Sequence, residues 1–242
     1  MAEKADVILI GAAKKLIVDG LQAAFNLHII PRGPEAAAAI AKVAANVRGA
    51  AVTGAPDKMM GDVMARLPKL ELVSSFGVGY DNVDAKYAAA HGITVCNTPE
   101  VLNEEVADTA LGLLLCTVRE FPQAERYLRA GKWLKGGYPL SATLRDRTVG
   151  IVGLGHVGSR TAHLAKAFGC RVLAYDPYLD EATCAERNAE KVELDTLLKE
   201  SDIVTVHCPL TRETRGMFGA EQYAMMKKGA LFISTARGSI HQ

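Results

Sequence analysis

Short apolar runs of strand length alternate with amphipathic stretches along the whole of this 242-residue chain. Such alternation is typical of parallel sheets covered by helices, because each helix returns the chain to the start of the next strand. In the first half, the predicted strands are Val7–Ile10, Leu27–Ile30, Ala50–Thr53, Leu70–Ser74 and Ile93–Cys96. The predicted helices of that half are Leu16–Phe25, Glu35–Asn46, Lys58–Leu67 and Asp84–His91. The pattern therefore predicts an α/β fold.

A long helical pattern separates this series from a second one. It runs from Asn103 to about Arg119, and its expected apolar face consists of Val106, Ala110, Leu113, Leu114 and either Thr117 or Val118. The glycine-rich segment from Gly131 to Arg147 is expected to be a loop. The second series has predicted strands at Thr148–Val152, Arg171–Tyr175, Lys191–Glu193, Ile203–Val206 and Leu231–Ser234, and predicted helices at His156–Phe168, Asp180–Ala189, Asp195–Glu200 and Ala220–Met226. We expect two domains, residues 1–98 and 99–242.

Charge and apolar segments exclude several classes of partner. The chain has 28 lysines and arginines against 27 aspartates and glutamates, and no basic run that could follow a nucleic acid backbone. The longest apolar segment, Ala107–Val118, contains Asp108 and is shorter than the roughly 20 residues of a membrane span. The N-terminus leads directly into a predicted strand, without room for a signal peptide. We therefore expect a cytoplasmic protein with neither nucleic acid nor membrane as a partner.

Cysteine and histidine spacing gives no sign of a metal site. The five cysteines include no C-x-x-C pair, and no two of the six histidines have the spacing of a zinc-binding helix. We expect the cysteines to be buried thiols.

The sequence Gly153-Leu154-Gly155-His156-Val157-Gly158 directly follows a predicted strand and opens a predicted helix. In that context a G-x-G-x-x-G pattern indicates a dinucleotide site. Gly153 permits a tight turn, Gly155 lets the backbone approach a pyrophosphate, and Gly158 lets the helix pack closely on the sheet. His156 and Val157 belong to the same cofactor-binding turn, with the His156 side chain expected on the helix surface. The pyrophosphate would lie at the helix N-terminus, which favours an anion.

Asp176 directly follows the next predicted strand. A carboxylate at this position can accept hydrogen bonds from the ribose hydroxyls and repels a 2′-phosphate. We therefore expect NAD rather than NADP as the cofactor. The alternative is a solvent-facing aspartate that precedes Pro177 in a turn.

Five motifs occur in an order that characterises one family. They are Phe76–Asp84 (FGVGYDNVD), Asn97–Asp108 (NTPEVLNEEVAD), Gly153–Gly158 (GLGHVG), His207–Thr211 (HCPLT) and Thr235–Gly238 (TARG). With these motifs the chain resembles the D-isomer-specific 2-hydroxyacid dehydrogenases, and among them the glyoxylate and hydroxypyruvate reductase branch. The resemblance implies a flavodoxin-like substrate domain and a Rossmann domain that binds NAD. In that family the substrate lies in the cleft between the two domains, and the long helix helps to form a homodimer.

The resemblance also implies roles for particular residues. Val78 and Gly79 match the positions whose backbone N–H groups hold the substrate carboxylate, where a glycine-rich turn permits close approach. Arg237 matches the active-site arginine that binds the carboxylate and carbonyl of a 2-oxo acid, since a guanidinium can engage two oxygens at once. The cofactor-facing residues that the resemblance implies are His207, Cys208, Pro209, Thr235 and Ala236. From the residues alone, the alternatives are a plain strand-to-helix turn at Val78 and Gly79 and a surface arginine at Arg237.

The family pattern continues past its T-A-R-G segment to a glutamate and an acid–base histidine, and neither motif follows Arg237 in this sequence. A positioned general acid contributes about 10²–10⁴-fold to such a reaction. We therefore expect a second domain that is incomplete at its C-terminus and a weak or inactive dehydrogenase of a small 2-oxo acid, such as glyoxylate or hydroxypyruvate. Two alternatives stay open: a catalytically silent NAD-binding sensor or scaffold, and another branch of the family, such as phosphoglycerate dehydrogenase.

Overall fold

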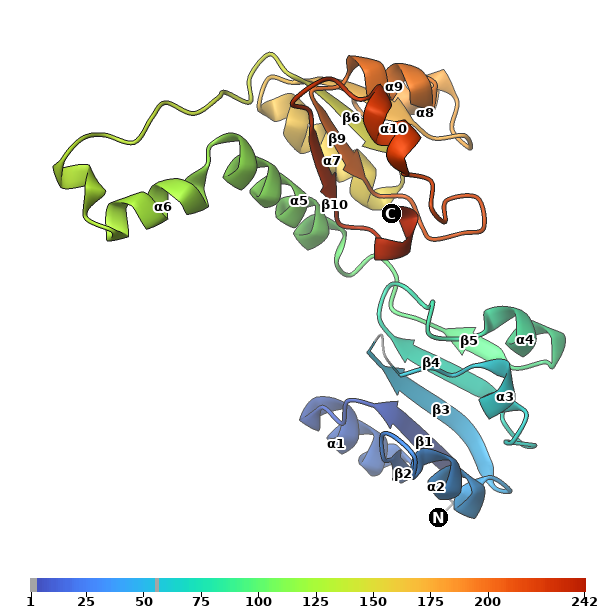
Figure 1. The fold of residues 1–242 in the computed structure, drawn as a ribbon. Coiled ribbons are helices and arrows are strands. Elements are labelled where there is room, and N and C mark those ends of the chain that lie inside the picture. The colour runs from blue at the N-terminus through green and yellow to red at the C-terminus, as the bar shows by residue number, and fades with distance from the viewer. Residues whose placement is uncertain (1–3, 55–56) are drawn as a thin grey trace. The chain divides into compact units, whose positions relative to one another are not determined.

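The computed structural model describes residues 4–54 and 57–242 (Figure 1). The chain forms two compact units, residues 1–101 and residues 102–242. Each unit contains one five-stranded sheet, and all neighbouring strands in both sheets run parallel. The predicted α/β fold with two parallel-sheet units is therefore confirmed.

The first unit has the strand order β2-β1-β3-β4-β5. Its strands are β1 (Asp6–Gly11), β2 (Asn26–Ile30), β3 (Val47–Thr53), β4 (Leu72–Phe76) and β5 (Thr94–Cys96). Its helices are α1 (Lys15–Ala24), α2 (Ala36–Val43), α3 (Gly61–Met64) and α4 (Ala85–Ala90). This is the order of flavodoxin-like sheets, in which ligands bind beyond the carboxyl ends of the strands.

The second unit has the strand order β10-β9-β6-β7-β8. Its strands are β6 (Thr148–Val152), β7 (Arg171–Tyr175), β8 (Glu190–Lys191), β9 (Ile203–Val206) and β10 (Leu231–Ser234). Its helices are α5 (Asn103–Val118), α6 (Phe121–Arg129), α7 (His156–Ala167), α8 (Glu181–Glu186), α9 (Leu194–Glu200) and α10 (Ala220–Met225), with short 3-10 helices at Lys132–Leu134 (η1) and Gly238–Ile240 (η2). Read from β8, this is the order of a Rossmann sheet, with its switch point between β6 and β9.

Successive side chains of the central strands point to opposite faces of the second sheet, so an apolar core forms on each face. Val149 and Ile151 of β6 belong to the cluster that includes Leu114 of α5 and Ala162 of α7. Val152 of the same strand belongs to the opposite cluster, which includes residues of α9 and the fully buried Phe218. Buried side chains on both faces are characteristic of a parallel sheet covered on both sides by helices.

The buried face of α5 differs from the predicted one. Leu113 is 46% exposed, whereas Ala107 and Leu111, which the predicted stripe omits, are buried with Ala110 and Leu114. The helix packs against α7, and Arg160 of α7 forms an ion pair with Glu104 at 2.7 Å. The position of α7 decides which stripe is covered, because α5 is apolar around much of its surface.

Two helices that were not predicted, α6 and η1, follow α5. Glu120 adopts a left-handed conformation (φ 53°) that ends α5, and Pro122 stands in the first turn of α6, where proline is tolerated. Figure 1 shows α6 extending away from the second sheet. The predicted loop is therefore wrong at residues 132–134, which form η1.

Candidate functional site

The three glycines between β6 and α7 have three different environments. Gly153 has a φ of +89°, and its N–H donates to the carbonyl oxygen of Tyr175 at 2.9 Å. A Cβ on Gly158 would overlap the carbonyl oxygen of Gly153. A Cβ on Gly155 would meet nothing within 4 Å. Two of the glycines are therefore required by the fold, whereas Gly155 borders open space.

The N-terminus of α7 opens onto that same space. Gly155 is the N-cap residue, and no side chain caps the helix. His156 is exposed and Val157 half-buried. The N–H groups in the first turn of a helix lack partners within the helix, and the helix dipole makes this end positive. A phosphate in front of Gly155 would supply the missing acceptors.

Asp176 faces the glycine turn rather than solvent. It is 9% exposed, and its Oδ2 accepts a hydrogen bond from the N–H of Leu154 at 2.9 Å. Its Oδ1 accepts from the N–H of Tyr178 at 3.0 Å. Arg187 also holds this turn, with Nη1 donating to the carbonyl oxygen of Leu154 at 2.6 Å. Each carboxylate oxygen keeps a further lone pair that can accept from a ribose hydroxyl.

Cys208 forms the second wall of the glycine turn. Its backbone nitrogen lies 2.7 Å from the position that a Cβ on Gly153 would occupy. Burial raises the pKa of the Cys208 thiol, and the charge of Asp176 adds to the effect. Pro209 follows and is exposed. The turn after β9 and the turn after β6 therefore lie against each other at the switch point of the sheet.

The His207 ring connects the ends of β9 and β10. Its Nε2 lies 3.0 Å from Oγ1 of Thr205, and its Nδ1 lies 3.1 Å from Oγ1 of Thr235. Burial lowers the pKa of His207 from 6.5 to about 4. The ring is therefore neutral at physiological pH, with one donor and one acceptor nitrogen.

Thr235, Ala236 and Arg237 follow β10. Thr235 and Ala236 are half-buried, and Arg237 is exposed. The register pairs Ser234 with Val206, so Thr235 stands opposite His207 at the carboxyl ends of the two strands. This is the sheet edge at which open α/β sheets bind ligands.

Val78 and Gly79 lie in the first unit, in the turn after β4. The Val78 carbonyl oxygen accepts from Nδ2 of Asn97 at 2.8 Å, and the Gly77 carbonyl oxygen accepts from the N–H of Thr98 at 3.0 Å. The carbonyl groups of Gly77 and Val78 are therefore fixed by Thr98 and Asn97. Among the described residues, no hydrogen bond from the N–H of Val78 or Gly79 is present.

The structure brings the predicted residues of the second unit into two groups. The glycine turn, Asp176 and Cys208 form one group, and His207 with Thr235 forms the other. Three further residues that were not predicted as site residues make hydrogen bonds to these groups or to the first-unit turn: Asn97, Thr205 and Arg187. Thr205 could have been noticed as the one polar residue of an apolar strand, and Asn97 as part of a family motif. Nothing in the local sequence points to Arg187.

The second unit fits a bound dinucleotide. Gly155 leaves the space that a pyrophosphate needs, and Asp176 stands at the end of the strand where a ribose would lie. In the part of the chain that the structure describes, no three histidine, cysteine, aspartate or glutamate side chains are grouped so that they could hold a metal ion. No helix among the described residues has the length and hydropathy needed to cross a membrane.

Comparison with known proteins agrees with this geometry. Residues 111–242 match the family described as "D-isomer specific 2-hydroxyacid dehydrogenase, NAD binding domain". The chain is 44% identical over 187 residues to a glyoxylate reductase of Korarchaeum cryptofilum, an alignment that covers 76% of this chain and 56% of that protein. It is 36% identical over 229 residues to a glyoxylate reductase of Thermococcus gammatolerans, covering 92% of this chain and 69% of that protein.

A solved structure of similar fold extends the match to nearly all of this chain. The NADPH-dependent glyoxylate/hydroxypyruvate reductase of Sinorhizobium meliloti, in complex with NADP and malonate, is 36% identical with a TM-score of 0.89. The match covers 99% of this chain and 73% of that one. The chain thus spans little more than half the length of the Korarchaeum relative. The resemblance drawn from the five motifs is confirmed, and the chain belongs to the D-isomer-specific 2-hydroxyacid dehydrogenase family.

Proposed function

We propose that this protein acts in the NADH-dependent reduction of a small 2-oxo acid, with glyoxylate and hydroxypyruvate as the first candidates. The observation that carries the proposal is the glycine turn, in which Gly153 and Gly158 are required by packing and Gly155 is not. A turn of this kind leaves open space where a pyrophosphate would reach the backbone. The reductases that match this chain supply the candidate substrates.

The assigned residues divide into cofactor-binding and substrate-binding groups. The cofactor, when bound, supplies the hydride. The backbone around Gly155, His156 and Val157 binds its pyrophosphate, and the turns after β9 and β10 border it through Cys208, Pro209, Thr235 and Ala236. Asp176 binds a ribose hydroxyl, which favours NAD, because a 2′-phosphate beside a buried carboxylate would be repelled.

The substrate is bound through its charge. The N–H groups of Val78 and Gly79 bind the carboxylate, and Arg237 binds carboxylate and carbonyl oxygens and polarises the carbon that receives the hydride. The group that supplies the proton is not among these assigned residues. Domain roles follow the same division: the first domain binds the substrate and the second binds the cofactor.

Binding and turnover of the 242-residue chain test this proposal. We expect NADH to bind at least about tenfold more tightly than NADPH, and Asp176→Ser to reduce that preference. Gly155→Val should weaken NADH binding by more than about tenfold, because it fills the space beside the helix N-terminus. Gly112→Val is the matched control, since a Cβ there also meets nothing within 4 Å but stands on α5. NADH binding can be followed by its fluorescence.

The substrate half of the proposal is tested with malonate, glyoxylate and hydroxypyruvate. In the presence of NADH, Arg237→Ala should weaken malonate binding by about 10–100-fold, as expected for loss of charged hydrogen bonds. NADH oxidation that Arg237→Ala abolishes would support a reductase. Binding of NADH without turnover would favour the cofactor-binding sensor or scaffold instead. Equal NADH affinity in wild type and Gly155→Val would overturn the proposed cofactor site.

We also propose that the protein is a homodimer, formed through the segment of α6 and η1. Large apolar side chains of this segment are exposed: Phe121 (51%), Leu128 (58%), Trp133 (57%) and Leu134 (91%). Large apolar side chains gathered on a protruding element are typical of an interface. A second copy of the chain is the proposed partner, and light scattering of wild type and Leu128→Ser tests it.

A cytoplasmic location is proposed from the cysteines. All five are free thiols, two of them buried (Cys170 and Cys184) and one exposed (Cys96), contrary to the expectation that all are buried. An exposed thiol persists in a reducing compartment. Fractionation of the native cells with detection by a specific antibody would test the location.

A further inference from the structure

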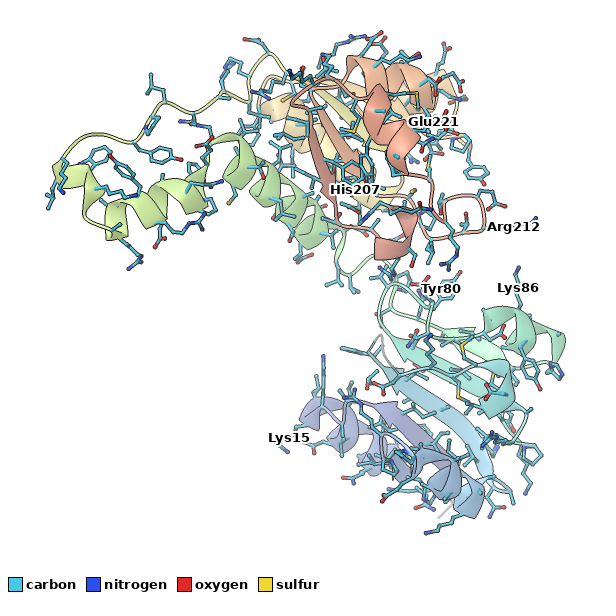
Figure 2. All side chains as sticks on the ribbon, in the orientation of Figure 1. Lys15, Tyr80, Lys86, His207, Arg212 and Glu221 are labelled. Carbon is cyan, nitrogen blue, oxygen red and sulfur yellow. The ribbon has the colours of Figure 1, made fainter. Side chains whose placement is uncertain are left out.

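His207, labelled in the second unit in Figure 2, makes hydrogen-bond contacts along three neighbouring strands. Its N–H donates to the carbonyl oxygen of Val152, the last residue of β6, at 2.8 Å. Its ring reaches Thr205 within β9 and Thr235 just beyond β10. The residue therefore joins the carboxyl ends of β6, β9 and β10, which are adjacent in the sheet.

The chemistry of the ring leaves no nitrogen for a ligand. A neutral imidazole has one N–H donor and one acceptor nitrogen, and each is within hydrogen-bond distance of a threonine hydroxyl. One threonine hydroxyl can donate to the acceptor nitrogen while the other accepts from the N–H. Both hydrogen bonds can therefore form at the same time. Because the ring is already fully engaged inside the protein, a cofactor cannot be its main partner.

The Thr235 contact lies two residues before Arg237, and a second anchor lies three residues after it. Ile240 is fully buried, and its N–H donates to the Arg237 carbonyl oxygen at 3.0 Å. The Ile240 carbonyl oxygen in turn accepts from the N–H of Phe218 at 3.0 Å. Arg237 is thus an exposed residue on a short segment that is fixed at both ends.

We propose that His207 is a positioning residue, which holds Arg237 in place through Thr235, and that its ring does not bind the cofactor. The inference rests on the proposed function only in taking Arg237 as the group that binds the 2-oxo acid. A guanidinium binds two oxygens well only when its backbone is held at the correct distance and angle. The hydrogen bond between His207 and Thr235 fixes the start of this segment, and Ile240 fixes its end.

The experiment uses the full chain and four variants. Thr235→Val removes the hydroxyl with little change of shape, and Thr235→Ser keeps the hydroxyl as the rescue variant. His207→Gln removes the ring, and His207→Gln combined with Thr235→Val measures whether the two residues act together. Hydrogen–deuterium exchange of the peptide that spans residues 235–242 is measured without any ligand. Malonate binding in the presence of NADH, and NADH binding alone, are measured beside it.

We expect faster exchange in residues 235–242 for Thr235→Val and His207→Gln, and wild-type exchange for Thr235→Ser. Malonate affinity should fall about tenfold in each of the first two variants, no further in the double variant, and not in Thr235→Ser. Because Thr235 also borders the proposed cofactor site, NADH affinity should fall by less than malonate affinity does. Unchanged exchange in Thr235→Val, or a loss of NADH affinity equal to the loss of malonate affinity, would overturn the inference. If His207→Gln does not fold, the two Thr235 variants decide. If the wild type binds neither ligand, the proposed function fails, and the exchange measurement alone decides the role of His207.

Discussion

At the scale of single residues, the clearest effect of burial is on His207, whose pKa it lowers. Its ring has the two threonine hydroxyls as partners, and among the described residues no acidic side chain offsets its desolvation. The charged form is therefore disfavoured, and the pKa of His207 falls from 6.5 to about 4. Protonation and folding are linked through this difference.

The pH dependence of stability should show this linkage. Between pH 6.5 and about 4, the unfolded chain binds a proton at His207 that the folded protein does not. The free energy of unfolding should therefore fall as the pH falls through this window, by about 3 kcal/mol in all, and this group should have no effect above it. Urea unfolding at a series of pH values measures the change.

The control for this prediction is His207→Gln, which cannot titrate. Carboxylates also titrate near pH 4, so the difference between wild type and variant isolates the histidine. An identical decline in both proteins would mean that His207 contributes nothing to the pH dependence.

At the scale of elements, α6 and η1 differ from α7 and α9, which pack on the second sheet. α7 and α9 bury apolar side chains against β6 and its neighbours, whereas α6 has no buried residue. A helix of nine residues is marginal on its own in water. Packing against another surface would supply the missing stability.

Replacing Leu128 by Ser should therefore convert the proposed dimer to a monomer, as measured by light scattering. The chain's single tryptophan, Trp133, lies in η1 and gives a second readout. Its emission should shift to longer wavelength on dissociation, because the indole becomes exposed to water. Leu16→Ser is the matched control, since Leu16 is 84% exposed on α1. A monomeric wild type with red-shifted emission at all concentrations would contradict the dimer.

At the scale of the whole molecule, each unit has its own hydrophobic core. One buried cluster, which includes Ile8 and Val73, is drawn from residues 1–101. The two clusters of the second unit, around Ile151 and Phe218, are drawn from residues 102–242. Among the described residues, no cluster combines side chains of both units.

Residues 102–242 should therefore fold when expressed alone and bind NADH within about threefold of the full chain. The physical reason is that the glycine turn, Asp176 and their packing partners all belong to this unit. Circular dichroism and NADH fluorescence measure the two outcomes. A fragment that stays unfolded would show that the second unit depends on the first.

Local patterns in the sequence determined much of this protein. The bounds of β6, β9 and β10 agree with the predicted strands, because apolar runs bounded by turns carry the signal within a few residues. The glycine turn could be predicted for the same reason, since a positive φ at Gly153 and a close approach at Gly158 demand glycine locally. The family followed from motifs read in order.

Only the tertiary structure decided which groups meet. The contact between His207 and Thr235 joins residues 28 apart in the sequence, and that between Arg187 and Leu154 joins residues 33 apart. Leu113 lies exposed on α5 because α7 covers a neighbouring stripe. Periodicity and residue type describe what a segment can bury or bond, but the partner of a side chain is set by long-range packing. For that reason the sequence predicted the cofactor turn, and the structure identified the residue that holds Arg237.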